Sequence, residues 1–101
     1  MDKNTFVVIR RRGPAWVAGK TMREQEGWPE HAQFMNQLAA EGFVLLGGPL
    51  ADTGEILLIV EAESEAEVRE RLYDDSWSVS GLLVVQSVRL WNILLVSQQK
   101  Q

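Results

Sequence analysis

Residues 55–62, EILLIVEA, are the part of this chain that most narrows the folds it can adopt. Their aliphatic and β-branched composition predicts a strand. Both faces of that strand are apolar, with Ile56, Leu58 and Val60 on one and Leu57 and Ile59 on the other. An antiparallel sheet with one face in water alternates apolar and polar residues. Both faces of this strand are therefore expected to be covered.

The whole chain predicts the order strand, helix, strand, strand, helix, strand. Pro29 suits the first turn of a helix and Gly42 ends one, while Ser64 and Glu67 form a capping box before a second helix. The predicted strands are residues 5–11, 43–47, 55–62 and 82–91, the last ending there or continuing through 93–96. The predicted helices are residues 29–41 and 65–73. Loops are expected at 15–28, with one helical turn, at 48–54 as a hairpin connection, and at 74–81.

This order predicts an α+β fold with a ferredoxin-like βαββαβ topology. Two helices would cover one face of a four-stranded antiparallel sheet, and a second copy of the sheet is the simplest cover for the other. We therefore expect a homodimer packed through its sheet faces. The alternative is a monomer whose strands are unevenly patterned.

Composition excludes several classes of protein. The chain has 101 residues, 46% of them apolar, and no cysteine, which excludes disulfides, thiolate catalysis and cysteine-bound metals. No apolar run approaches the roughly 18 residues of a membrane span, and the start lacks a signal-peptide pattern. We expect one cytoplasmic domain over residues 1–96 and a polar tail over 97–101.

The charges are unevenly distributed along the chain. Residues 1–23 hold six of the ten cations, whereas thirteen of the fourteen carboxylates lie between Glu24 and Asp75. A net charge of -4 without a continuous basic stripe argues against nucleic-acid binding. The basic N-terminal segment is either a local anion-attracting patch or a solvated strand end and loop.

His31 is the single histidine of the chain. Its spacing from Phe34, Met35 and Leu38 puts it on the apolar face of the predicted helix, directed toward the sheet. There it is either a structural hydrogen-bonding group or, given a carboxylate that fixes its tautomer, a general base. Asp75, beside Trp77 in the 74–81 loop, is the best candidate partner, and the alternative for it is a helix-capping role.

Other chemistries find little support. One histidine with scattered carboxylates lacks the ligand spacing of a metal site. The sequence contains no serine-nucleophile elbow, dinucleotide fingerprint or P-loop. Gly47 and Gly48 serve a turn or allow a ligand close to the backbone. No metal and no cofactor are predicted.

Several segments together match the order and spacing of a known family. They are WPEHAQFMNQLAAEG, VLLGGPL, EAESEAEVRERL, DDSWSVSG and VVQSVRLW. On these segments the chain resembles the YCII-related family of dimeric α+β barrel proteins across residues 6–91. GPAWVAGKTMREQ is similar to a longer first connection found in one branch of that family.

The resemblance implies a ferredoxin-like fold that dimerises through its sheets. It also implies an active-site pair of His31 and Asp75. The family aspartate is commonly followed by proline, where this chain has Ser76. The resemblance suggests lyase-like or dehydrochlorinase-like proton chemistry on small molecules, aromatic ones among them, although some members have no known activity.

The first hypothesis is thus a small cofactor-free enzyme in which His31 transfers a proton and Asp75 orients it. Its candidate substrate-binding residues attract an anion or line an apolar pocket: Arg11, Arg12, Lys20, Arg23, Trp16, Trp28, Trp77 and, through its backbone, Gly48. The second hypothesis is a non-catalytic module that binds a small molecule in the same cleft. A third is a haem-handling or quinol-oxidising protein; an RNA binder is disfavoured by the acidity.

Overall fold

The structure, a computed structural model, describes residues 3–98; residues 1–2 and 99–101 lie outside the described part. Four antiparallel strands form one sheet in the order β2-β3-β1-β4. The strands are β1 (Asn4–Arg12), β2 (Val44–Pro49), β3 (Glu55–Ala62) and β4 (Leu83–Leu90), and the helices are η1 (Met22–Glu24), α1 (Trp28–Ala40), α2 (Glu65–Tyr73) and α3 (Ser76–Ser80). This is the ferredoxin-like α+β topology that the sequence predicts; η1 is the helical turn expected within residues 15–28, and α3 is an addition.

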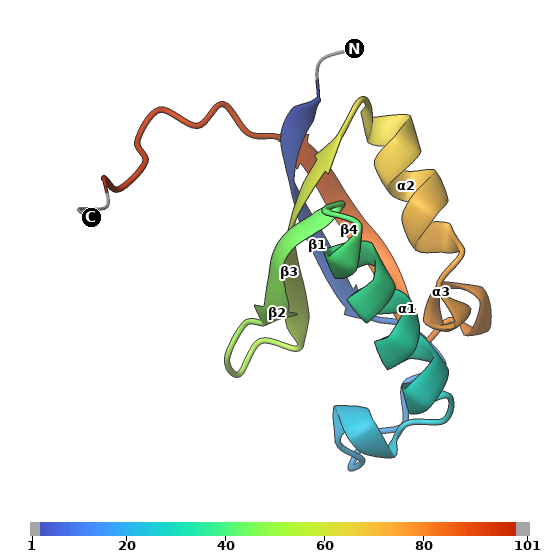
Figure 1. Ribbon diagram of the computed structural model, residues 1–101. Helices are drawn as coiled ribbons and strands as arrows, with labels where there is room; N and C mark the ends of the chain where they lie inside the picture. The colour runs from blue at the N-terminus through green and yellow to red at the C-terminus, as the bar shows by residue number, and fades with distance from the viewer. Residues whose placement is uncertain (1–2, 99–101) are drawn as a thin grey trace.

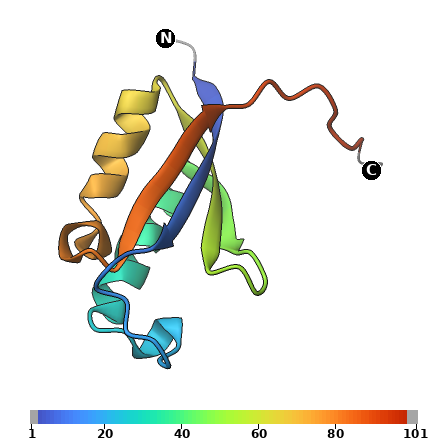
Figure 2. The same cartoon turned by 180° about the vertical axis from the view of Figure 1, so that it is seen from behind.

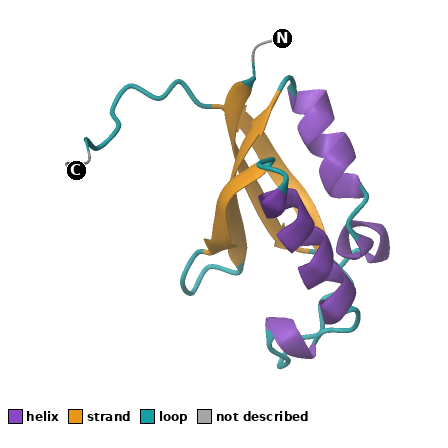
Figure 3. Cartoon of the chain, viewed as in Figure 1, coloured by secondary structure: helices purple, strands orange, loops and turns teal. Residues whose placement is uncertain are grey.

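The two long helices lie side by side on one face of the sheet (Figures 1 and 3). Between helices and sheet lies the main core, which contains Phe6, Val8, Leu38, Leu58, Val60, Val68 and Leu72. The short elements η1 and α3 lie at the end where β1 finishes and β4 begins (Figure 1). That end of the molecule contains the candidate site.

The opposite face of the sheet, which we call the open face, is seen from behind in Figure 2. Among the described residues no helix lies on it. Its apolar side chains are half-buried and come from three neighbouring strands: Val7, Ile9, Leu57, Ile59 and Val84. Within one chain, then, only one of the two apolar faces is covered by helices.

The structure corrects one predicted loop and decides one alternative that the sequence left open. Residues 74–81 were expected to be a loop, but Ser76–Ser80 form α3, because the Asp75 side chain accepts a hydrogen bond from the Trp77 N–H and caps the helix. A continuation of the last strand through 93–96 is not found, and residues 91–98 have no regular structure. The reason is that β1 begins at Asn4, so β4 runs out of a pairing partner just beyond Leu90.

The pairing of β1 with β4 contains a bulge. Ile9 pairs with Ser87 and Arg10 with Val85, so Gln86 is left as an extra residue on β4. A bulge of this kind increases the local twist and changes the direction of neighbouring side chains. It lies beside Arg10, whose side chain reaches the candidate site.

Gly13 provides a test of how tightly this end of the sheet is built. Its N–H donates to the Leu82 carbonyl at 2.8 Å, and a Cβ added there would lie 2.2 Å from the Gly81 carbonyl oxygen. Gly13→Ala must therefore displace backbone, and we expect it to lower the free energy of unfolding by about 1–3 kcal/mol in urea denaturation. Gly48→Ala is the control, because an added Cβ at Gly48 would meet nothing within 4 Å; a change beyond about 0.5 kcal/mol there would contradict this account.

Candidate active site

The first turns of α1 place His31. Gly27 caps the helix with φ 81°, a conformation that glycine adopts readily, and the His31 N–H donates to the Gly27 carbonyl at 3.0 Å. The helix begins at Trp28, one residue before the predicted start, with Pro29 in its first turn. His31 and Leu38 are buried on the face that the spacing predicts, so the imidazole is directed toward the sheet.

Asp75 lies within hydrogen-bond reach of that imidazole. His31 Nδ1 is 2.8 Å from Asp75 Oδ2 and 3.0 Å from Oδ1. The same carboxylate accepts the Trp77 N–H at 3.1 Å as the cap of α3. Asp75 therefore fills both roles that the sequence left open, helix cap and histidine partner.

Arg10 is a third member of the site that the sequence reasoning missed. Its Nη1 donates to Asp75 Oδ2 at 2.9 Å and its Nη2 donates to Ser78 Oγ at 2.9 Å. The side chain is only 1% exposed, and its Nε is buried without a partner among the described residues. A signal was present, because Arg10 follows Phe6 and Val8 at alternate positions and so falls on the inner face of β1, where a charge needs a partner.

The buried carboxylate is held in its ionised form. Burial raises the pKa of Asp75, but the hydrogen bond and positive charge of His31, the Trp77 N–H and Arg10 together lower it below its ordinary value. An ionised carboxylate only accepts hydrogen bonds, so His31 Nδ1 carries the proton and donates it to Asp75. Nε2 is thus the atom of the ring left to act on a ligand.

Trp77 holds the imidazole in place from one side. The two rings are stacked with centroids 4.0 Å apart and an interplanar angle of 4°. Trp77 is itself 1% exposed, and its Nε1 donates to the Glu26 carbonyl at 2.9 Å. The backbone N–H of Trp77 is bound to Asp75 and its indole N–H to Glu26, so the indole cannot move aside easily. The stacked indole therefore opposes rotation of the His31 ring away from Asp75.

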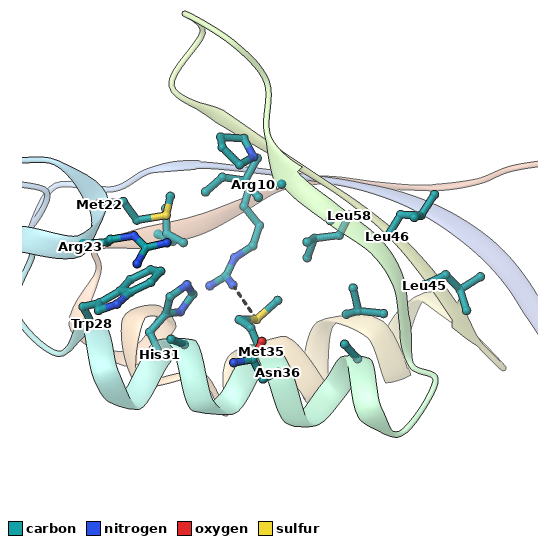
Figure 4. A pocket seen from close by; sticks show the side chains of 18 residues that line it. Arg10, Met22, Arg23, Trp28, His31, Met35, Asn36, Leu45, Leu46 and Leu58 are labelled. Atoms are coloured by element: carbon teal, nitrogen blue, oxygen red, sulfur yellow. Dashed lines mark hydrogen bonds between the residues drawn. The ribbon is translucent and has the colours of Figure 1, made fainter.

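His31 forms part of the wall of a cavity of about 590 Å³ between α1, β2 and the inner face of the sheet (Figure 4). This size is in the range of small-molecule sites. Three of the predicted substrate-binding residues line it, namely Arg23, Trp28 and Gly48. The lining also includes Arg10, and no carboxylate, so its charged groups are cationic.

The other predicted substrate-binding residues lie elsewhere. Arg11 and Lys20 are exposed and line no part of this cavity. Trp16 lines a second cavity together with Arg12, and reaches the site only through an edge contact with Trp77, at 6.2 Å between ring centroids. Trp77 supports His31 from behind and is not part of the lining.

Ser76 occupies the first position of α3. The N–H of that position has no partner inside a helix, so proline or another residue fits there equally well. Serine in place of the family's proline at position 76 therefore does not prevent Asp75 from capping α3 and hydrogen-bonding to His31.

The described residues show neither a metal cluster nor a membrane helix. No group of three or more His, Cys, Asp or Glu side chains among them is arranged to hold a metal ion. None of the helices in the described part is long and apolar enough to cross a bilayer.

Removing the carboxylate should destabilise the fold through Arg10. Asp75→Asn leaves the guanidinium buried without an anion, and we expect a loss of about 3–5 kcal/mol in the free energy of unfolding, measured in urea. Arg10→Met combined with Asp75→Asn removes both charges and should recover part of that loss. A double variant as unstable as the sum of the two single variants would contradict a direct ion pair.

Acid should weaken the same contact. Because the pKa of Asp75 is lower in the folded protein than in the unfolded chain, its contribution to stability is complete above the unfolded value and is lost as pH falls through the folded value. The wild-type protein should therefore lose stability below about pH 4. The Asp75→Asn protein lacks this titration, so its unfolding free energy should fall less steeply over the same pH interval.

One of three comparisons with known proteins finds a match. The model of the YCII-related domain matches residues 5–92, nearly the whole of the folded part. Comparison with curated proteins gives no match, and comparison with solved structures gives none either. On the strength of the family match, the chain belongs to the family of YCII-related domains.

Proposed function

We propose that the cavity beside His31 is the active site of a small cofactor-free enzyme, and that His31 Nε2 transfers a proton in a lyase-like or dehydrochlorinase-like reaction. One observation carries the proposal: Nδ1 is tied to a buried carboxylate while the ring lines a cavity. This arrangement fixes the tautomer with its lone pair on Nε2 and stabilises the imidazolium formed when Nε2 takes a proton. A histidine with only a structural role has no need of a cavity beside it.

The lining supports a small substrate that is anionic or aromatic. Arg10 and Arg23 are its charged groups, and Arg23 lies over the Trp28 ring, 5.5 Å from the ring centroid. Arg10 is already paired with Asp75, so among the described residues that line the cavity Arg23 is the cation placed to meet a substrate anion. The indole of Trp28 and the aliphatic side chains offer contacts to an apolar or aromatic body.

The proposed chemical step needs no other reagent. His31 Nε2 takes a proton from a carbon next to an electron-withdrawing group, and the electron pair of the broken C–H bond becomes the new C=C bond. A leaving group on the neighbouring carbon departs with its own bonding pair. The imidazolium then gives its proton to the leaving group or to water, which restores the neutral ring. Positive charge at Arg23 would stabilise the carbanionic or enolate character that develops.

A non-catalytic binding module of the same fold is the second candidate. The observation that favours it is that, among the described lining residues, His31 is the one side chain suited to proton transfer near neutral pH. In that case Nε2 simply hydrogen-bonds to the ligand, and the cavity selects for size and negative charge.

The two candidates are separated by His31→Gln, in which the amide can still donate to Asp75 but has no basic nitrogen. Small carboxylates carrying an acidic C–H and a β-leaving group are incubated with the protein, and product is followed by NMR. Catalysis predicts measurable turnover of at least one compound, and a loss of about 10²–10⁴-fold in His31→Gln. An activity unchanged by that substitution would refute the role of His31.

The binding module predicts a different result from the same protein pair. No compound is turned over, and His31→Gln alters the affinity for a bound carboxylate, measured by calorimetry. Val79→Ala is the control for both assays, because Val79 is 68% exposed on α3 and lies outside the cavity lining.

The open face supports the further proposal of a homodimer. Its side chains Val7, Ile9, Leu57, Ile59 and Val84 form a contiguous apolar surface on paired strands, and contiguous apolar surfaces of this kind mark interaction sites. In a two-fold symmetric dimer the same surface of both copies forms the interface, so the open face of a second copy can cover this one.

Ile59→Asp tests this assembly. It places a charge in the middle of the open face, and we expect sedimentation to show a monomer where the wild-type protein is a dimer. Val79→Asp adds the same charge on a helix away from that face and should leave the mass unchanged. A wild-type monomer, or a dimer that survives Ile59→Asp, would show that the open face is not the interface.

A further inference from the structure

The segment that follows β4 is apolar, and its last three residues are almost wholly exposed. Trp91–Val96, WNILLV, which we call the C-terminal arm, has no regular structure and extends away from the sheet and helices (Figures 1 and 2). Leu94, Leu95 and Val96 are 82%, 92% and 79% exposed. At the start of the arm, the Trp91 N–H donates a hydrogen bond to the Thr5 carbonyl of β1 at 2.9 Å. Four exposed aliphatic residues in a row are a strong sign of a missing partner.

We propose that the C-terminal arm of one copy pairs with the outer edge of β2 in a second copy, as an additional strand beside the candidate active site. The composition of the arm favours an extended strand, since it is rich in β-branched and aromatic residues. An extended segment satisfies its backbone N–H and C=O groups by adding to a free strand edge. The arm therefore needs an edge as well as an apolar contact.

The strand order leaves two outer edges, those of β2 and β4. On β4 the exposed residues are Gln86, Arg89 and, at the end of the strand, Leu90 at 66%. The edge strand β2 instead exposes Leu45 and Leu46, at 47% and 70%, and carries no charge. Figure 4 shows these two leucines on the side of β2 away from His31. Leu46 pairs with Ile59, so its side chain lies on the open face. The edge of β2 thus lacks the charge that Arg89 gives to β4, and it suits the uncharged arm.

The arm cannot easily reach the β2 edge of its own chain. β2 and β4 lie at opposite sides of the sheet, about 14 Å apart at a spacing of roughly 4.8 Å between strands. To cross that distance the chain would have to reverse just after Leu90, and no glycine or proline lies between Leu90 and Val96. In a dimer that packs through the open face, the arm could reach the β2 edge of the second copy without reversing its direction after Leu90.

Such pairing would complete the cavity. Leu45, Leu46, Gly47, Gly48 and Pro49 of β2 form one side of its lining. A strand added outside β2 widens that wall, and every second side chain of the partner's arm then faces the helix side, where the cavity opens. Exclusion of water from the cavity would strengthen the electrostatic interactions there. The proposal rests on the homodimer proposed above and does not depend on catalysis by His31.

Disulfide trapping tests the pairing directly, because the chain has no cysteine of its own. An untagged Leu46→Cys protein is mixed with tagged proteins that carry one cysteine each at positions 93, 94, 95 or 96, and the mixture is oxidised. We expect a product of untagged plus tagged mass for at least one arm position. Tagged Val79→Cys is the matched control on an exposed aliphatic residue of α3. If no arm position exceeds this control, the proposal is overturned.

A double variant separates pairing between copies from folding back within one chain. Leu46→Cys combined with the arm cysteine that trapped best should give covalent dimers. A disulfide that forms within single chains, seen as faster gel migration without a gain in mass, would mean that the arm covers its own β2 and would overturn the proposal.

Access to His31 provides a second readout that needs no substrate. As the single histidine of the chain, it can be followed through its reaction with diethyl pyrocarbonate at 240 nm. A chain ending at Leu90 should react about tenfold faster than the full chain if the arm covers the cavity, and Leu94→Asp should do the same in the full chain. Equal rates would show that the arm does not close the site. The Ile59→Asp experiment tests a different proposal, namely that the open face is the dimer interface.

Discussion

The site is organised by one buried carboxylate. Asp75 is fully buried and accepts hydrogen bonds from three separate elements: Arg10 on β1, His31 on α1 and the Trp77 N–H on α3. An ion in such a place is tolerated only when its hydrogen-bonding capacity is filled. The three donors therefore fix the relative positions of sheet and helices at one end of the molecule, and the same contacts fix the tautomer of His31. In this protein the interaction that stabilises that end is also the one that prepares the imidazole.

Sequence patterns predicted the parts of the fold and site that depend on local periodicity. The spacing of His31 with Leu38 gave the correct buried face, and the Ser64 capping box opened α2 as expected, with Ser64 Oγ accepting the Glu67 N–H at 3.1 Å. Arg10 was missed because its charge was grouped with the exposed Arg11 and Arg12. Arg11 lies on the opposite face of β1, and Arg12 is the last residue of that strand, whereas Arg10 lies within the strand on its inner face. The helix α3 was missed because five residues have too little periodicity to show, although a capping role for Asp75 was among the alternatives.

The apolar pattern of residues 55–62 is only half explained by one chain. Leu58 and Val60 are buried under the helices, whereas Leu57 and Ile59 stay half-exposed on the open face. The C-terminal arm has the same character, and both features lie outside the core that the helices form. Assembly and the closure of the cavity would then depend on the same surfaces, so the concentration of the protein would affect the environment of His31 as well as its oligomeric state.

The bulge on β4 explains why residues 82–91 show no regular alternation. Leu83 and Val85 face the helices before it, and Val88 faces them after it, so the inward positions change from odd to even numbers across Gln86. A strand that lost residue 86 would alternate without interruption and keep every inner side chain on the inner face. Loss of a residue farther along β4 would instead exchange the two faces beyond that point. Position 86 is therefore a place where the length of this chain can change by one residue while the core, and the Arg10 side chain opposite, keep their sides of the sheet.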